Sequence, residues 1–132
     1  MPHRAILVLA AAALVSLQPL SAADLADVKT RGTLRVIVSA DEAPETFDAK
    51  GGARPGFERE LLETFARVQG IKLDVLPAKS LADRIPMLLA GKGDLVVAIF
   101  DTPERRQQIA FSAEIMPTYN VAVTLAPKPA PK

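Results

Sequence analysis

The sequence predicts one α/β domain in three layers, a mostly parallel sheet with helices on both faces. From Thr33 onward, short apolar runs alternate with amphipathic stretches, which is the pattern of successive strand, helix, strand units. The run Leu95–Ile99 is apolar throughout, as expected of a strand that is buried on both faces of such a sheet. The chain has 132 residues, a length that suits a single core.

The first 23 residues have the features of a secretory signal peptide. A short basic start precedes an apolar run over residues 5–17, and the small residues Ser21–Ala23 suit cleavage. We expect cleavage after Ala23, so that the mature chain begins at Asp24 and is periplasmic. The apolar run is shorter than the roughly 20 residues of a membrane-spanning helix, so we expect no permanent membrane anchor.

Charge and residue types exclude several classes of function. Only one arginine and no acid lie in the leader, so the mature chain carries 15 basic and 15 acidic side chains, a balance that predicts no nucleic-acid partner. Cysteine is absent, and the one histidine lies in the leader. Ser-His-Asp catalysis and zinc sites built on these residues are therefore excluded from the mature chain. We expect no cofactor, no metal and no enzymatic activity.

The first strand is expected at Leu34–Val38. A polar segment over residues 39–55 follows it, as a hairpin-like excursion or a binding loop. Residues 56–69 are expected to form a helix, because apolar residues recur on one helical face and Gly70 suits its end. The residues of this face, which we expect to pack on the sheet, are Phe57, Leu61, Phe65 and Val68.

The second half of the domain repeats this alternation. A strand is expected at Leu73–Leu76, and Ser80 and Asp83 have the spacing of a capping pair for the helix that follows. Pro86 lies inside that helix and should bend it. The third strand is expected at Asp94–Phe100.

The domain is expected to span residues 24–125, with a last strand at Tyr119–Leu125. Residues 126–132 alternate proline with alanine and lysine, a composition typical of an extended tail or a truncated linker.

Two loops are candidates for a binding site. In open parallel sheets, ligands lie beyond the carboxyl ends of the strands. The loop after the first strand carries Asp41, which suits an ammonium group or is simply solvated, and Phe47, which presents its ring to a solute or plugs the edge of its own core. The loop after the third strand carries Asp101, Thr102 and Arg105.

The segment Thr102–Arg106 predicts a helix start. Thr102 suits the capping position and Pro103 the first helical position, so that Arg105 lies beside amide groups that favour an anion. A guanidinium in that place suits the clamping of a carboxylate. The alternative is a turn that opens a helix without any ligand, which is common for this pattern.

The acids of the first long helix, Glu58, Glu60 and Glu63, are interpreted as a solvated face and rejected as a general acid and base pair. Gly51 and Gly52 lack the spacing of a phosphate-binding loop and are interpreted as a turn.

Five segments, in this order, resemble the bacterial extracellular solute-binding proteins of family 3. They are Gly32–Val36, Pro44–Phe47, Gly56–Leu61, Ile85–Asp94 and Thr102–Arg105. The resemblance implies one lobe of a periplasmic binding protein of type II fold. Such proteins have two lobes that close on amino acids or related solutes and deliver them to ABC importers. Similar modules serve as sensor domains or as the noncatalytic half of some membrane-bound lytic transglycosylases.

The resemblance also implies roles for several residues. Arg105 falls on the family arginine that holds the carboxylate of an amino acid, and Thr102 follows the hydrogen-bonding segment. Phe47 falls near an aromatic residue that packs on the ligand. Asp101 stands where serine, threonine or glycine is usual, and its charge would oppose a carboxylate.

Only the first lobe is expected, which leaves a solute covered on one side and predicts weak affinity, about millimolar or poorer. The expected function is therefore recognition of a small polar solute for an ABC transporter, by a truncated or partial form whose partners are a permease or a separate second lobe. The alternatives are a regulatory or interaction module that needs a partner and, third, an enzyme resembling the cyclohexadienyl dehydratases.

Overall fold

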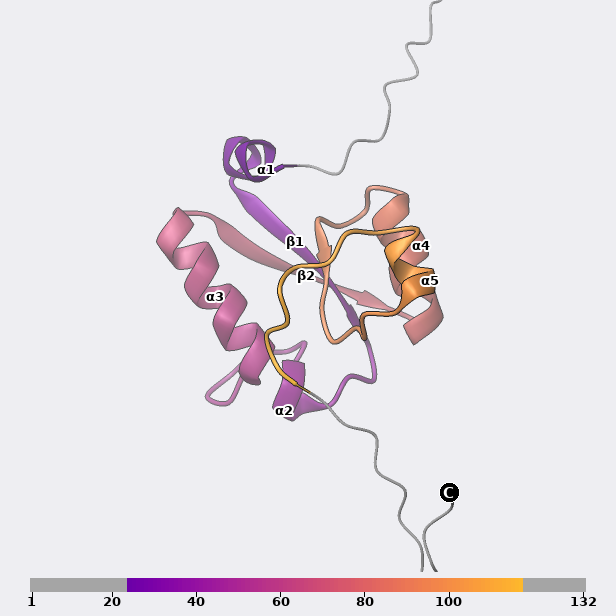
Figure 1. Ribbon diagram of the computed structural model, residues 1–132. Coiled ribbons are helices and arrows are strands. Elements are labelled where there is room, and N and C mark those ends of the chain that lie inside the picture. The colour runs from indigo at the N-terminus through magenta and orange to yellow at the C-terminus, as the bar shows by residue number, and fades with distance from the viewer. Residues whose placement is uncertain (1–23, 118–132) are drawn as a thin grey trace, which may run out of the picture. The chain divides into compact units, whose positions relative to one another are not determined.

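The computed structural model describes residues 24–117 (Figure 1). The chain divides into two compact units, one up to Ala98 and one from Ile99 onward. The predicted leader, the predicted last strand and the predicted proline-rich tail lie outside the described residues. Within the described range, none of the helices is both long and apolar enough to cross a membrane.

The first unit contains a parallel sheet of three strands in the order β2-β1-β3. The central strand β1 (Thr33–Ser39) pairs along its whole length with β2 (Lys72–Ala78), and Val36 faces both Val75 of β2 and Leu95 of β3 (Leu95–Val96). The helices α3 (Phe57–Gln69) and α4 (Arg84–Leu89) lie on opposite sides of the sheet (Figure 1). The predicted α/β class with helices on both faces of a parallel sheet is confirmed.

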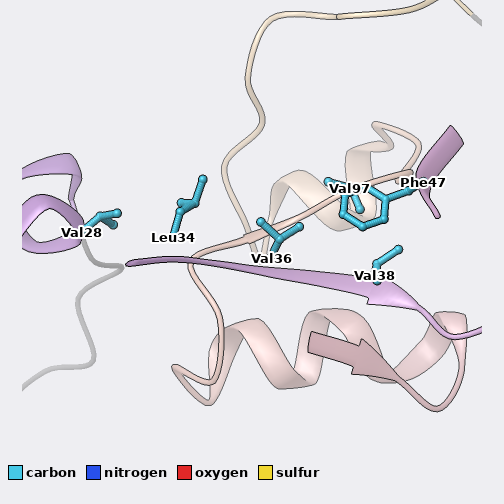
Figure 2. Packing of buried hydrophobic residues seen from close by; sticks show 6 residues of the cluster. All are labelled: Val28, Leu34, Val36, Val38, Phe47 and Val97. Carbon is cyan, nitrogen blue, oxygen red and sulfur yellow. The ribbon is translucent and has the colours of Figure 1, made fainter. Parts of the chain in front are cut away.

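The core of this unit lies along the central strand. Its buried side chains come mainly from β1, with one from the first helix, one from the segment after β1 and one from the residue that follows β3 (Figure 2). They are Val28, Leu34, Val36, Val38, Phe47 and Val97. Phe47 is only 1% exposed, so its ring fills the core.

Two helices that the sequence did not predict flank β1. The helix α1 (Leu25–Arg31) is capped at its start by Asp24, whose carboxylate accepts a hydrogen bond from the Asp27 N–H, and at its end by Gly32, which has a φ of 73°. The segment predicted as a loop contains the one-turn helix α2 (Pro44–Phe47). This turn carries Phe47 into the core, where it contributes to the cluster shown in Figure 2.

The face of α3 that contacts the sheet differs from the predicted one. Phe57 is 48% and Val68 is 74% exposed, whereas Glu58 and Ala66 are buried and Leu62 contacts the core cluster. Glu58, Leu62 and Ala66 are four residues apart and form one stripe. Because Ala66 is small and the Glu58 carboxylate has a hydrogen-bonding partner, this stripe can lie against the sheet in place of the larger apolar one.

The segment after β2 forms two short helices, η1 (Leu81–Asp83) and α4, where the sequence predicted one bent helix. Ser80 donates its hydroxyl to the Asp83 side chain at 2.8 Å, and neither side chain caps the backbone of the helix it precedes. The predicted third strand is much shorter than expected. It ends because Ala98 has a φ of 51°, a left-handed conformation that takes the chain out of the sheet.

Candidate functional site

The carboxyl end of β1 carries two acids of the first unit. Ser39, the last residue of the strand, is buried and donates its hydroxyl to Asp41 Oδ1 at 2.7 Å. The Asp41 carboxylate is otherwise exposed. The next acid, Glu42, places its Oε2 3.9 Å from Nη1 of Arg84. Of the two acids at this strand end, Asp41 is exposed and Glu42 is half-buried.

A buried hydrogen-bond cluster surrounds the peptide groups that follow β3. Glu58 Oε2 accepts a hydrogen bond from the Ala98 N–H at 2.8 Å. Arg84 Nη1 donates to the carbonyl of Val97 at 2.7 Å and to that of Ala98 at 2.9 Å. The first turn of α3 and the first residue of α4 thus hold the same short stretch of backbone from two sides.

Glu58 is 8% exposed, so its interpretation as part of a solvated helix face is wrong. Burial raises the pKa of its carboxyl group, with a smaller contribution from the charge of Glu42. The Ala98 N–H and the Arg84 charge act in the opposite direction. The sequence signal for this burial was present: Glu58 shares a helix stripe with Leu62 and Ala66, although the larger apolar stripe beside it was the stronger pattern.

The second unit contains the predicted helix start. Thr102 Oγ1 accepts a hydrogen bond from the Arg105 N–H at 3.3 Å, which caps α5 (Pro103–Arg106) as expected. The Arg105 guanidinium donates one hydrogen bond from Nη1 to the Phe100 carbonyl at 2.8 Å. Its Nε and Nη2 groups have no partner among residues 24–117. Arg105 is therefore fixed at one nitrogen and retains donors for another group.

Asp101 pairs with the neighbouring arginine of this unit. Arg106 donates from Nε to Asp101 Oδ1 at 2.7 Å and from Nη2 to Oδ2. The Arg106 guanidinium also lies 5.8 Å from the centre of the Phe111 ring. The two-point pair partly neutralises the charge by which Asp101 would oppose a bound carboxylate.

The five predicted binding residues divide between the two units. Asp101, Thr102 and Arg105 belong to the second, whereas Asp41 and Phe47 belong to the first. The Phe47 ring is buried in the core, in agreement with the alternative interpretation of this residue, and is not exposed to solvent. Convergence of the two loops on one solute stays a prediction. In the described part of the chain, no group of three or more His, Cys, Asp or Glu is arranged to hold a metal ion.

The first unit is a small parallel α/β domain, and the segment that follows β3 in the chain carries an arginine with available donors. Residues 34–130 match the model of the bacterial extracellular solute-binding proteins, family 3, and the chain belongs to this family. The resemblance found in the sequence is confirmed.

Solved structures of amino-acid-binding proteins are similar to this lobe. The ancestral amino acid-binding protein AncCDT-1, a precursor of cyclohexadienyl dehydratase, has a TM-score of 0.60 at 36% identity over 69% of this chain and 40% of that one. The arginine-bound form of domain 1 from TmArgBP has a TM-score of 0.56 at 34% identity, over 65% of this chain and 68% of that one.

Curated relatives carry the name of an enzyme. Membrane-bound lytic murein transglycosylase F of Aeromonas hydrophila subsp. hydrophila is 35% identical over 88 residues, 66% of this chain. Its counterpart in Pseudomonas fluorescens is 33% identical over 87 residues, 64% of this chain. The matched segments span 17% and 18% of those proteins. The expectation of no enzymatic activity is contradicted, because these relatives are named as enzymes, and the chain matches only a part of each of them.

Proposed function

We propose that this chain is a recognition lobe for a small solute that carries a carboxylate, with a cationic amino acid as the best candidate. The observation that carries the proposal is the hydrogen bonding of the Arg105 guanidinium. One of its nitrogens is anchored at the Phe100 carbonyl, and two further nitrogens have no partner among the described residues. A guanidinium held in this way suits a two-point pair with a carboxylate.

The preference for a cationic solute rests on the descriptions of two similar solved structures. One similar solved structure is described as an ancestral cationic amino acid solute binding protein, and another as an arginine-bound single domain. The second of these supports binding by one lobe alone.

The test compares arginine with agmatine, which has the same guanidinium but no carboxylate, by titration calorimetry on the full chain. We expect binding of arginine, weaker or no binding of agmatine, and a loss of at least about tenfold in arginine affinity in Arg105→Ala. Arg67→Ala, which removes an exposed arginine of α3, is the matched control and should bind as the unmodified chain does. Equal affinity for arginine and agmatine would contradict the proposal.

The cellular setting is proposed to be the periplasm, as part of solute uptake by an ABC transporter. The family assignment to extracellular solute-binding proteins supports this setting. A permease or a separate second lobe is the proposed partner. Co-purification of the chain with a permease whose transport responds to arginine is the expected outcome.

A second candidate is a recognition lobe of a lytic murein transglycosylase, and the names of the curated relatives favour it. In this setting the lobe binds a carboxylate-bearing fragment of murein through the same Arg105. Replacing the matched segment of the Aeromonas hydrophila relative with residues 24–117 of this chain should then preserve murein cleavage. Loss of cleavage in a folded chimaera would favour the transporter setting.

A further inference from the structure

The backbone at Ala98 is unusual in this fold. Its φ of 51° is the only positive value at a residue other than glycine in the described part of the chain. A side chain with a Cβ atom is strained in this conformation, which persists where the surroundings impose it. At Ala98 the surroundings are the Glu58 carboxylate on the N–H and the Arg84 guanidinium on the carbonyl.

Both holding groups are charged and almost fully buried. Glu58 is 8% and Arg84 is 3% exposed, and they come from helices on opposite sides of the sheet. Burying two charged groups is unfavourable unless they are paired and hydrogen-bonded. A neutral core would stabilise the sheet without them, so their placement at one strained peptide indicates a role in fixing the backbone there.

Ala98 is also the last residue of the first unit, and the chain continues from it toward Thr102 and Arg105. The backbone angles of Ala98 set the direction in which this segment leaves β3. We propose that Glu58 is a positioning residue for solute recognition, whose ionised carboxylate holds Ala98 in the conformation that presents Thr102 and Arg105. This inference rests on the proposed function of Arg105.

Protonation of Glu58 should weaken this hold. The charged groups that face Glu58 are Glu42 and Arg84, and burial is the main reason why its pKa is raised. An ionised carboxylate forms a stronger hydrogen bond with an N–H than a neutral carbonyl oxygen does. Arginine affinity should therefore fall as the pH is lowered through the raised pKa of Glu58.

The variant Glu58→Gln separates positioning from a purely structural role. Its amide oxygen can still accept the Ala98 N–H, but without charge. A carboxyl group with a raised pKa in the folded state contributes stability below its unfolded pKa and loses that contribution as the pH rises through the folded value. At neutral pH the variant should thus melt at the same temperature as the unmodified chain or higher, while its arginine affinity falls about fivefold. A structural role alone predicts that both quantities fall together.

The experiment measures arginine affinity and the backbone amide shifts of Ala98, Thr102 and Arg105 between about pH 8 and pH 4, a range that contains raised glutamate pKa values. We use the full chain, Glu58→Gln, and Glu60→Gln as a matched control on the exposed face of α3. The three amides should titrate together in the unmodified chain and in Glu60→Gln. In Glu58→Gln, the chemical shifts of these three amides should stay unchanged over the same pH range.

Two results would overturn the inference: titration of the Ala98 amide without any response of Thr102 and Arg105, or equal arginine affinity of Glu58→Gln and the unmodified chain at neutral pH. Absence of arginine binding by the unmodified chain would contradict the proposed function. In that case the amide titration still decides whether Glu58 positions the segment.

Discussion

Asp94 and Arg35 are joined by backbone and side-chain hydrogen bonds at the amino-terminal end of the sheet. Asp94 Oδ2 accepts the Arg35 N–H at 2.8 Å, and Oδ1 accepts Nη2 of the same arginine at 2.8 Å. Arg31 adds an ion pair to Oδ2 at 2.6 Å. Asp94 is thereby tied to the central strand β1 immediately before β3 begins, which sets the alignment of the two strands.

Removal of the Asp94 charge should therefore destabilise the fold. The Asp94 side chain is 3% exposed, and Asp94→Asn leaves two arginines without their shared partner. We expect a loss of about 3 kcal/mol in the free energy of unfolding at neutral pH, measured by urea denaturation. Asp74→Asn, which removes an exposed acid from β2, serves as the control and should change little.

The same pair predicts that the free energy of unfolding depends on pH. Burial alone would raise the pKa of Asp94, but the hydrogen bonds and charges of Arg35 and Arg31 outweigh it and hold the pKa below its usual value of 3.8. A lowered carboxyl pKa gives stability that is present above the unfolded pKa and is lost as the pH falls through the folded one. The difference in the free energy of unfolding between the unmodified chain and Asp94→Asn should shrink as the pH falls through the lowered pKa of Asp94. A difference that stays constant with pH would contradict the role of the Asp94 charge.

Two phenylalanines test where the core lies. Phe47 is buried and Phe57 is 48% exposed, although the sequence predicted that Phe57 packs on the sheet. Phe47→Ala should reduce the free energy of unfolding by about 3–5 kcal/mol, and Phe57→Ala by less than about 1 kcal/mol. Chemical denaturation of both variants gives the comparison. Equal losses would place α3 on the sheet in the predicted orientation.

Gly93 lies against the central strand so closely that it leaves no room for a side chain. A Cβ atom at this position would lie 2.5 Å from Cγ1 of Ile37, which is fully buried. Gly93→Ala should cost about 1–3 kcal/mol. In a double-mutant cycle, the loss should be smaller in an Ile37→Val background, because Ile37 Cδ1 is the second atom that the new group meets. Additive losses would show that the two residues do not crowd each other.

The pair between Arg106 and Asp101 affects recognition more than stability. Both side chains are exposed, so Arg106→Ala should change the free energy of unfolding by less than about 0.5 kcal/mol. It leaves Asp101 unpaired, and arginine affinity should fall up to about threefold through repulsion of the solute carboxylate. Asp101→Asn in the same background should restore the affinity, and calorimetry distinguishes the two results.

Local signals in the sequence predicted those elements that depend on neighbouring residues. The Thr102 cap of α5 and the central strand β1 follow from short patterns, and both are confirmed. The orientation of α3 did not follow, because the partner that permits burial of Glu58 is the amide of Ala98, 40 positions away. The spacing of apolar residues along a helix favours the stripe with the largest side chains as the buried one. Which stripe lies against a sheet also depends on small residues that allow close approach and on hydrogen-bond partners that are distant in the sequence.

The strand order β2-β1-β3 constrains how the chain acquires its structure. Among the strands that the structure describes, the one in the middle of the sheet is synthesised first, and its two edges stay unpaired until residues 72–78 and 95–96 have been made. Strands that are far apart in the sequence pair slowly, because the entropy of closing a long loop is lost before the contacts between the strands contribute any free energy. Until Leu95 of β3 has reached it, Val36 has an open edge, so the newly made chain depends on β3 to block pairing of this edge with other molecules.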